Sequence, residues 1–156
     1  MSDSSVAARS PRDVLHLYHQ AMLAVSADAL ADLYAVDGIH EFPLTAPGRP
    51  PRYNGREEIR AGYGAAWGAS PARVNEIRNV VVHETADPEV IVAEQEVAAT
   101  VTTTGQPFTL AFLLVMRVRD GLIVHLRDYM DALGAAHALG RLPAIIAALS
   151  SPVSAA

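Results

Sequence analysis

The chain has 156 residues, 51% of them hydrophobic and 19% charged, with a formal net charge of −5. This length and balance predict one soluble domain with a full hydrophobic core. The acidic net charge and scattered arginines argue against nucleic acids or anionic membranes as partners. Because the chain has neither cysteine nor lysine, disulfides, thiolate chemistry, cysteine-ligated metals and lysine Schiff bases are excluded. The N-terminus lacks a basic leader and an apolar stretch, which predicts a cytoplasmic protein.

The first half of the chain carries helix signals. Residues 1–9 are expected to be disordered, and Ser10-Pro11-Arg12-Asp13 then predicts a helix start. Its buried stripe is Val14, Leu17, Tyr18, Ala21 and Val25. Ser26 is expected to cap a second helix that turns Leu30, Leu33 and Tyr34 inward, and a third helix is expected over 56–67.

Between the second and third helices the pattern is irregular. Asp37-Gly38 predicts a turn and residues 39–43 a short strand. The proline- and glycine-rich segment 45–55 is long enough to form a mobile lip.

The second half of the chain changes to strand patterns. Strands are expected over residues 73–85, 89–104, 107–118 and 122–130. Asp131 is placed to cap a helix over 132–139, residues 143–149 are a candidate lid, and 151–156 a disordered tail. The prediction is a single α+β domain over 10–150, in which a curved, mostly antiparallel sheet wraps three N-terminal helices and a short C-terminal helix follows.

The expected strand 107–118 has no polar face between Leu110 and Met116. A strand that is apolar on both sides is expected to be covered on both sides. The helices cover one side, so a second copy of the chain is the simplest cover for the other. The sequence therefore predicts a homodimer formed through the outer sheet face.

Asp128 lies on an apolar strand face. With a period of two, Leu122, Val124, Leu126, Asp128 and Met130 share one side of the strand. A lone carboxyl among apolar side chains is a candidate proton carrier, and the alternative is a structural aspartate held by backbone amides or an arginine.

Three segments resemble the SnoaL-like proteins of the nuclear transport factor 2-like, ketosteroid isomerase-like fold. They are Tyr34-Ala-Val-Asp-Gly-Ile-His-Glu-Phe-Pro, Tyr53-Asn-Gly-Arg-Glu-Glu-Ile-Arg and Leu126-Arg-Asp-Tyr-Met-Asp. The resemblance covers roughly residues 12–140 and implies a cone-shaped domain around an apolar cavity. It leaves activity open, because this fold hosts isomerases, cyclases, dehydratases, epoxide hydrolases and binding domains.

The resemblance also assigns positions one by one. Tyr18 matches the oxyanion-binding tyrosine of ketosteroid isomerases, whereas Phe42 and Leu114 stand where those enzymes have two aspartates. Asp128 matches the last aspartate of the limonene-type epoxide hydrolase set, whereas Gln95 and Val97 replace its arginine and first aspartate. SnoaL-type cyclases require mainly one acid at the pocket end of a late strand, and Asp128 meets that requirement.

The catalytic candidates are therefore Asp128, His40 and Tyr18. His40 is expected to face the pocket and either polarise a carbonyl or relay protons to Asp128, or else to be a satisfied histidine at the rim. Tyr18 either steadies an oxyanion or packs in the core. Glu94 and Glu96 are expected to face outward and pair with Arg127 or Arg117.

Gln95 is the expected inward polar group that orients a substrate oxygen. The other expected substrate-binding residues are apolar or aromatic: Tyr34, Phe42, Tyr63, Trp67, Leu114 and Met116. His16 and His19 lack a third ligand at plausible spacing, so no metal site is expected.

These residues predict a cofactor-independent acid–base enzyme acting on a hydrophobic, oxygenated molecule such as a polyketide, steroid or terpenoid. Three alternatives remain open: a non-catalytic carrier of a hydrophobic ligand, a limonene-type epoxide hydrolase with an altered site, and an assembly domain that uses its sheet face.

Overall fold

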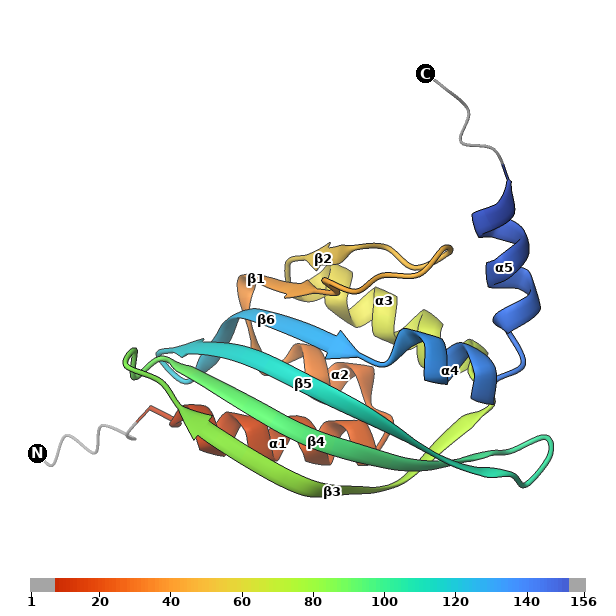
Figure 1. Cartoon of the computed structure of the whole chain (residues 1–156). Coiled ribbons are helices and arrows are strands. Elements are labelled where there is room, and N and C mark those ends of the chain that lie inside the picture. Colours follow the sequence, from red (N-terminus) through yellow and green to blue (C-terminus); the bar gives the residue numbers. More distant parts are fainter. Residues whose placement is uncertain (1–7, 152–156) are drawn as a thin grey trace, which may run out of the picture.

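Six strands form one curved sheet in the order β2-β1-β6-β5-β4-β3, and helices lie against its inner side (Figure 1). The computed structural model describes residues 8–151, and the predicted disordered ends fall largely on residues 1–7 and 152–156, which lie outside that range. The helices are α1 (Pro11–Leu23), α2 (Ala27–Ala31), α3 (Arg56–Ala69), α4 (Ala132–Ala138) and α5 (Leu142–Ser150). The strands are β1 (Tyr34–Glu41), β2 (Arg52–Asn54), β3 (Ala72–Glu84), β4 (Val90–Val101), β5 (Pro107–Arg119) and β6 (Leu122–Met130).

The predicted α+β architecture is confirmed. Strands β3 to β6 form an antiparallel meander, β2 pairs antiparallel with β1, and only β1 and β6 run parallel. The core lies between the inner face of this sheet and helices α1, α2 and α3. The inner face is therefore the place where an inward polar side chain is removed from water.

The helix starts follow the predicted capping chemistry. Ser10 Oγ accepts a hydrogen bond from the Asp13 amide, and the Asp13 carboxylate accepts one from the Ser10 amide. Ser26 caps α2 and Asp131 caps α4 in the same manner, through the amides of Ala29 and Gly134. The capped helix α1 buries Tyr18 against the sheet.

The segment before the loop differs from the prediction. No turn interrupts the chain at Asp37-Gly38, because β1 runs from Tyr34 to Glu41 with a register irregularity against β6 between Tyr34 and Ile39. A Cβ on Gly38 would lie 2.8 Å from the carbonyl oxygen of Ile123, so a glycine permits the close approach of β1 to β6. Tyr34 consequently belongs to β1 and not to the second helix.

The strand that carries Asp128 contains a bulge that the period of two did not predict. Arg117 pairs with His125 and Val118 with Ile123, so Val124 is an extra residue on β6. Ile123 is therefore buried, whereas Leu122 and Val124, expected to face inward, are only half-buried. Beyond the bulge, Leu126 and Asp128 face inward as predicted.

The outer sheet face is only partly covered in the single chain. On β5, Leu114 and Met116 are buried, while Leu113 and Val115 on the other side are half-buried and Ala111 is exposed. The predicted complete cover is thus not supplied within residues 8–151.

The predicted partners of the outward glutamates are wrong. Glu94 contacts His83 at 2.7 Å, and Glu96 contacts Arg78 at 3.3 Å. Both partners lie on β3, because β3 flanks β4 on the edge side.

The C-terminal segment does not form the predicted lid. Helix α5 has no buried residue and stands beside α4, away from the sheet (Figure 1). Its apolar side chains Ile146 and Leu149 are exposed.

Candidate functional site

Asp128 lies near the end of β6 with its side chain on the inner face, opposite Leu114 of β5. Only 5% of its surface is exposed. Its Oδ1 atom has no hydrogen-bond partner among residues 8–151. A buried polar atom without a partner costs about 1–3 kcal/mol, so most such atoms in folded proteins have a specific explanation.

His40 lies on β1, and its ring is completely buried beside Asp128. Its Nδ1 atom is 2.7 Å from the Tyr34 hydroxyl, and its Nε2 atom is 2.9 Å from the Tyr63 hydroxyl. The same Nε2 atom lies 3.6 Å from Asp128 Oδ2. A neutral imidazole has one donor and one acceptor nitrogen, so two hydroxyl groups can satisfy it.

Three tyrosines around this pair, Tyr18, Tyr34 and Tyr63, are held in the protonated form. Burial raises the pKa of Tyr18, and the negative charge of Asp128 raises it further, while hydrogen bonding with Tyr63 opposes the shift. Burial is also the main cause that raises the pKa of Tyr34 and of Tyr63. Each phenol is therefore a hydrogen-bond donor across the ordinary pH range.

Gln95 supplies a second unpartnered polar group. It is buried on the inner face of β4, where its Oε1 atom lies 2.6 Å from His19 Nε2 of α1. Within the described residues its Nε2 atom has no acceptor. Burial lowers the pKa of His19, and the hydrogen bond to Gln95 opposes this shift.

The structure brings the expected wall residues into the same interior. Phe42, Leu114 and Met116 are buried, and the Phe42 ring lies 4.6 Å from the His40 ring. Tyr63 and Trp67 of α3 are half-buried, with ring centroids 4.9 Å apart. Of these side chains, Leu114 lies opposite Asp128, and the Phe42 and Tyr63 rings lie beside the His40 ring.

Three contacts within the candidate site were missed by sequence reasoning. Tyr34 and Tyr63 were expected only to line the cavity, yet both hydroxyl groups bind His40. His19 was considered only as a metal ligand, yet it binds Gln95. Nothing in the local sequence pattern marks these contacts, because two of them join separate elements and the Tyr34–His40 contact spans six residues of the irregular strand β1.

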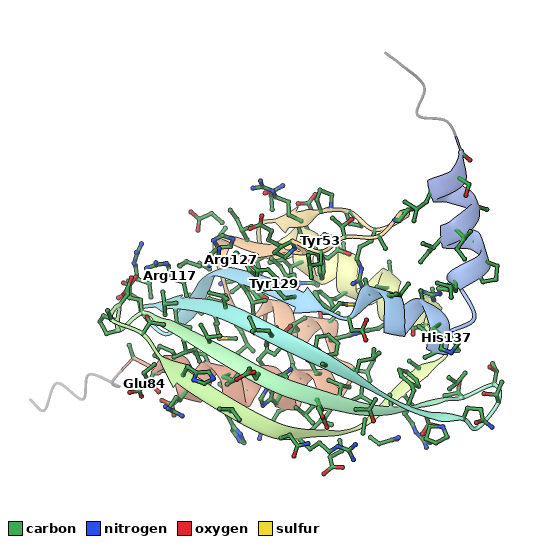
Figure 2. The ribbon with its side chains drawn as sticks, in the orientation of Figure 1. Tyr53, Glu84, Arg117, Arg127, Tyr129 and His137 are labelled. Carbon is green, nitrogen blue, oxygen red and sulfur yellow. The ribbon has the colours of Figure 1, made fainter. Side chains whose placement is uncertain are left out.

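Two hollows on the described surface are lined by residues outside this cluster. One, of about 290 Å³, is lined by the start of α1 and the β3–β4 turn. The other, of about 240 Å³, lies on the outer face around Val115, Arg117 and Arg127. Figure 2 shows Arg117 and Arg127 on β5 and β6, with Tyr129 farther along β6.

The epoxide hydrolase pattern required an arginine that reaches Asp128. Arg56 instead donates to the carbonyl oxygen of Tyr34, with its Nε atom 2.8 Å away. Among residues 8–151, no arginine forms an ion pair with Asp128.

None of the helices within residues 8–151 is long and apolar enough to cross a membrane.

The family match agrees with the observed fold. The SnoaL-like domain model matches residues 14–126, and the chain belongs to this family, whose fold is that of SnoaL-type cyclases and isomerases. The chain is 32% identical over 130 residues to an uncharacterized PhzA/B-like protein of Pseudomonas aeruginosa, covering 82% of this chain and 90% of that protein.

Solved structures show the same fold. A protein of Bacillus subtilis described as a candidate isomerase has a TM-score of 0.76 and 26% identity, over 83% of this chain and 92% of that one. A candidate polyketide cyclase of Pseudomonas putida has a TM-score of 0.67 and 19% identity, over 84% and 98%. A Catenulispora acidiphila protein with a ketosteroid isomerase-like fold has a TM-score of 0.63 and 19% identity, over 85% and 95%.

Proposed function

We propose that this protein is a cofactor-independent acid–base enzyme of the SnoaL cyclase or isomerase type, acting in the cytoplasm on a hydrophobic, oxygenated molecule such as a polyketide, steroid or terpenoid. The observation that carries the proposal is the buried Asp128 carboxylate, whose Oδ1 atom is unpartnered within residues 8–151 and whose Oδ2 atom lies 3.6 Å from His40. A carboxylate with a free acceptor atom in apolar surroundings is suited to take a proton from carbon.

The remaining groups have complementary roles in this proposal. Asp128 accepts a proton from the carbon next to a substrate carbonyl and returns it to the product. Tyr18 donates a hydrogen bond to the oxygen that gains negative charge, and the unpartnered Gln95 Nε2 atom orients a second substrate oxygen. His40, held by two tyrosine hydroxyls, keeps the carboxylate in place and relays protons.

In this proposal, entry of a ligand to Asp128 requires a movement of side chains or of a loop. Neither of the two hollows described above is lined by Asp128, which is only 5% exposed. In our proposal Tyr63 and Trp67, both half-buried on α3, or the loop 43–51 shift when the substrate enters. Trp67 is the only tryptophan of the chain, so its fluorescence reports this movement.

Proton abstraction is tested by deuterium exchange. The α-protons of 2-tetralone, androst-5-ene-3,17-dione and carvone are followed by NMR in deuterated buffer, with and without the protein. We expect exchange of at least one ketone above the buffer rate, and a loss of roughly 10²- to 10⁴-fold in Asp128→Asn. Glu94→Gln, on the outer face, is the control. Exchange that is absent for all three ketones, or unchanged in Asp128→Asn, contradicts the proposal.

A second candidate is a carrier that binds a hydrophobic ligand without catalysis. It is favoured by Phe42 and Leu114, the apolar residues at the two positions where ketosteroid isomerases have aspartates. The same variant separates the two functions, because a carrier keeps all its measurable function in Asp128→Asn.

We also propose that the active form is a homodimer joined through the outer sheet face. Leu113 and Val115 of β5 and Tyr129 of β6 are half-buried there, and Leu113 lies directly opposite Tyr129. A partly covered apolar face at the centre of a sheet is a typical site of association.

A further inference from the structure

Arg49 is a half-buried cation without a carboxylate partner among residues 8–151. It lies in the loop between β1 and β2, where its amide donates to the carbonyl oxygen of Ala46. Its guanidinium carbon is 4.6 Å from the centroid of the Phe42 ring, and its Nη1 atom is 2.7 Å from Met130 Sδ. Its positive charge also acts on Tyr53, where it opposes the raised pKa that burial causes.

These contacts leave most of the hydrogen-bonding capacity of Arg49 unused. A guanidinium has five N–H donors, whereas an aromatic ring and a thioether are weak partners. Other arginines of the chain are engaged differently: Arg60 contacts three carboxylates, and Arg117 contacts two. A half-buried guanidinium with free donors is suited to bind a carboxylate through two parallel hydrogen bonds.

Arg49 also lies at the strand ends that carry the acid–base pair. Strands β1 and β6 run parallel, with Glu41 opposite Arg127, so both end at the same edge of the sheet. Phe42 follows His40 by two residues, and Met130 follows Asp128 by two residues. Two residues of a strand span about 7 Å. Phe42 and Met130, which hold the guanidinium, therefore lie about 7 Å beyond His40 and Asp128 along their strands.

We propose that Arg49 binds a carboxylate group of the substrate, and that the substrate is therefore a hydrophobic organic acid. The carboxylate pairs with the guanidinium, while the apolar body reaches past Phe42 so that the reacting carbon lies at Asp128. This inference rests on the proposed function and narrows its substrate class. Arg49 acts here as a binding residue that sets specificity and takes no part in proton transfer.

The test compares two probes that differ mainly in charge. The full-length protein is titrated at pH 7 with 2-naphthoate and with the uncharged 2-naphthamide, and binding is measured by calorimetry. We expect the acid to bind at least about tenfold more tightly than the amide, as a charge-assisted hydrogen-bonded pair provides. Arg49→Met removes this preference, and Arg49→Lys keeps part of it.

Arg52→Met is the matched control, because Arg52 is an exposed arginine on β2, three residues along the chain. It is expected to leave both affinities unchanged. Equal affinities for the two probes in the wild-type protein, or a preference that survives in Arg49→Met, overturn the inference. Failure of both probes to bind at millimolar concentration overturns it as well.

A failure of the proposed function can be distinguished from a failure of this inference. Asp128→Asn is expected to keep the preference for 2-naphthoate while losing proton exchange. If naphthoate binds through Arg49 but exchange is the same in wild type and Asp128→Asn, the acid is bound and the acid–base mechanism is wrong.

Discussion

His40 and Asp128 lie side by side but share no close hydrogen bond, since 3.6 Å separates Nε2 from Oδ2. Both imidazole nitrogens are occupied by tyrosine hydroxyls at 2.7 and 2.9 Å. The histidine is therefore fixed in orientation by Tyr34 and Tyr63, whereas the carboxylate beside it keeps its Oδ1 atom free within the described chain. This asymmetry separates the two groups: the imidazole is held in a fixed orientation beside the carboxylate, and the carboxylate is the group with an atom available to a ligand.

Replacing Asp128 by asparagine is expected to leave the free energy of unfolding unchanged or to raise it by about 1 kcal/mol. The change keeps the side-chain volume and removes a buried charge that lacks a hydrogen bond, so little stabilising interaction is lost. Urea denaturation at pH 7 measures the effect. Leu126→Ala, on the same face of β6, is the reference and is expected to lose about 2–4 kcal/mol. A loss of 3 kcal/mol or more in Asp128→Asn would reveal a structural ion pair with a charged His40.

The buried phenols are expected to resist ionisation at alkaline pH. Burial raises the pKa of Tyr18, Tyr34 and Tyr63, so the folded protein retains protons that the unfolded chain releases near pH 10. The stability due to these groups is present below pH 10 and is lost as the pH rises above it. Absorbance at 295 nm should show these three phenols ionising only with unfolding, whereas all five tyrosines of the chain titrate near pH 10 in 6 M guanidinium. Ionisation of all five near pH 10 in the folded protein, judged by circular dichroism, contradicts this expectation.

A charge placed at the centre of the outer sheet face is expected to separate the proposed dimer. Leu113→Arg introduces an unpaired cation opposite Tyr129, and a buried unpaired charge costs several kcal/mol at an interface. Light scattering after size exclusion should give a dimer for the wild type and a folded monomer for the variant. Thr103→Arg, in the exposed β4–β5 turn, should remain dimeric. A wild-type protein that is monomeric in this measurement contradicts the proposed dimer.

Local chemistry made much of this fold predictable. The caps at Ser10, Ser26 and Asp131 depend only on residues three positions along the chain, so the pattern predicts them well. The inward face of Asp128 followed from strand periodicity near the end of β6. The pairing of long neighbouring strands followed from the turns between them.

The unpredicted features depend on contacts that local sequence patterns do not define. The hydroxyls that hold His40 come from residues 6 and 23 positions away in the sequence, on β1 and α3. The partners of Glu94 and Glu96 depend on the register between β3 and β4, which alternation alone does not define. The turn expected at Asp37-Gly38 is overridden because β1 pairs with β6, a strand more than 80 residues farther along.

The surplus residue at Val124 controls which side of the sheet receives the acid. If side chains alternated regularly from the buried Ile123 onward, without the bulge, Arg127 would face the helices and Asp128 would face outward. Regular pairing of β6 at its present length would thus exchange an anion for a cation in the interior, whereas removing Val124 together with the bulge would leave Asp128 facing inward. In relatives and engineered variants, the presence of this bulge at a given strand length is therefore as decisive for chemistry as the identity of residue 128.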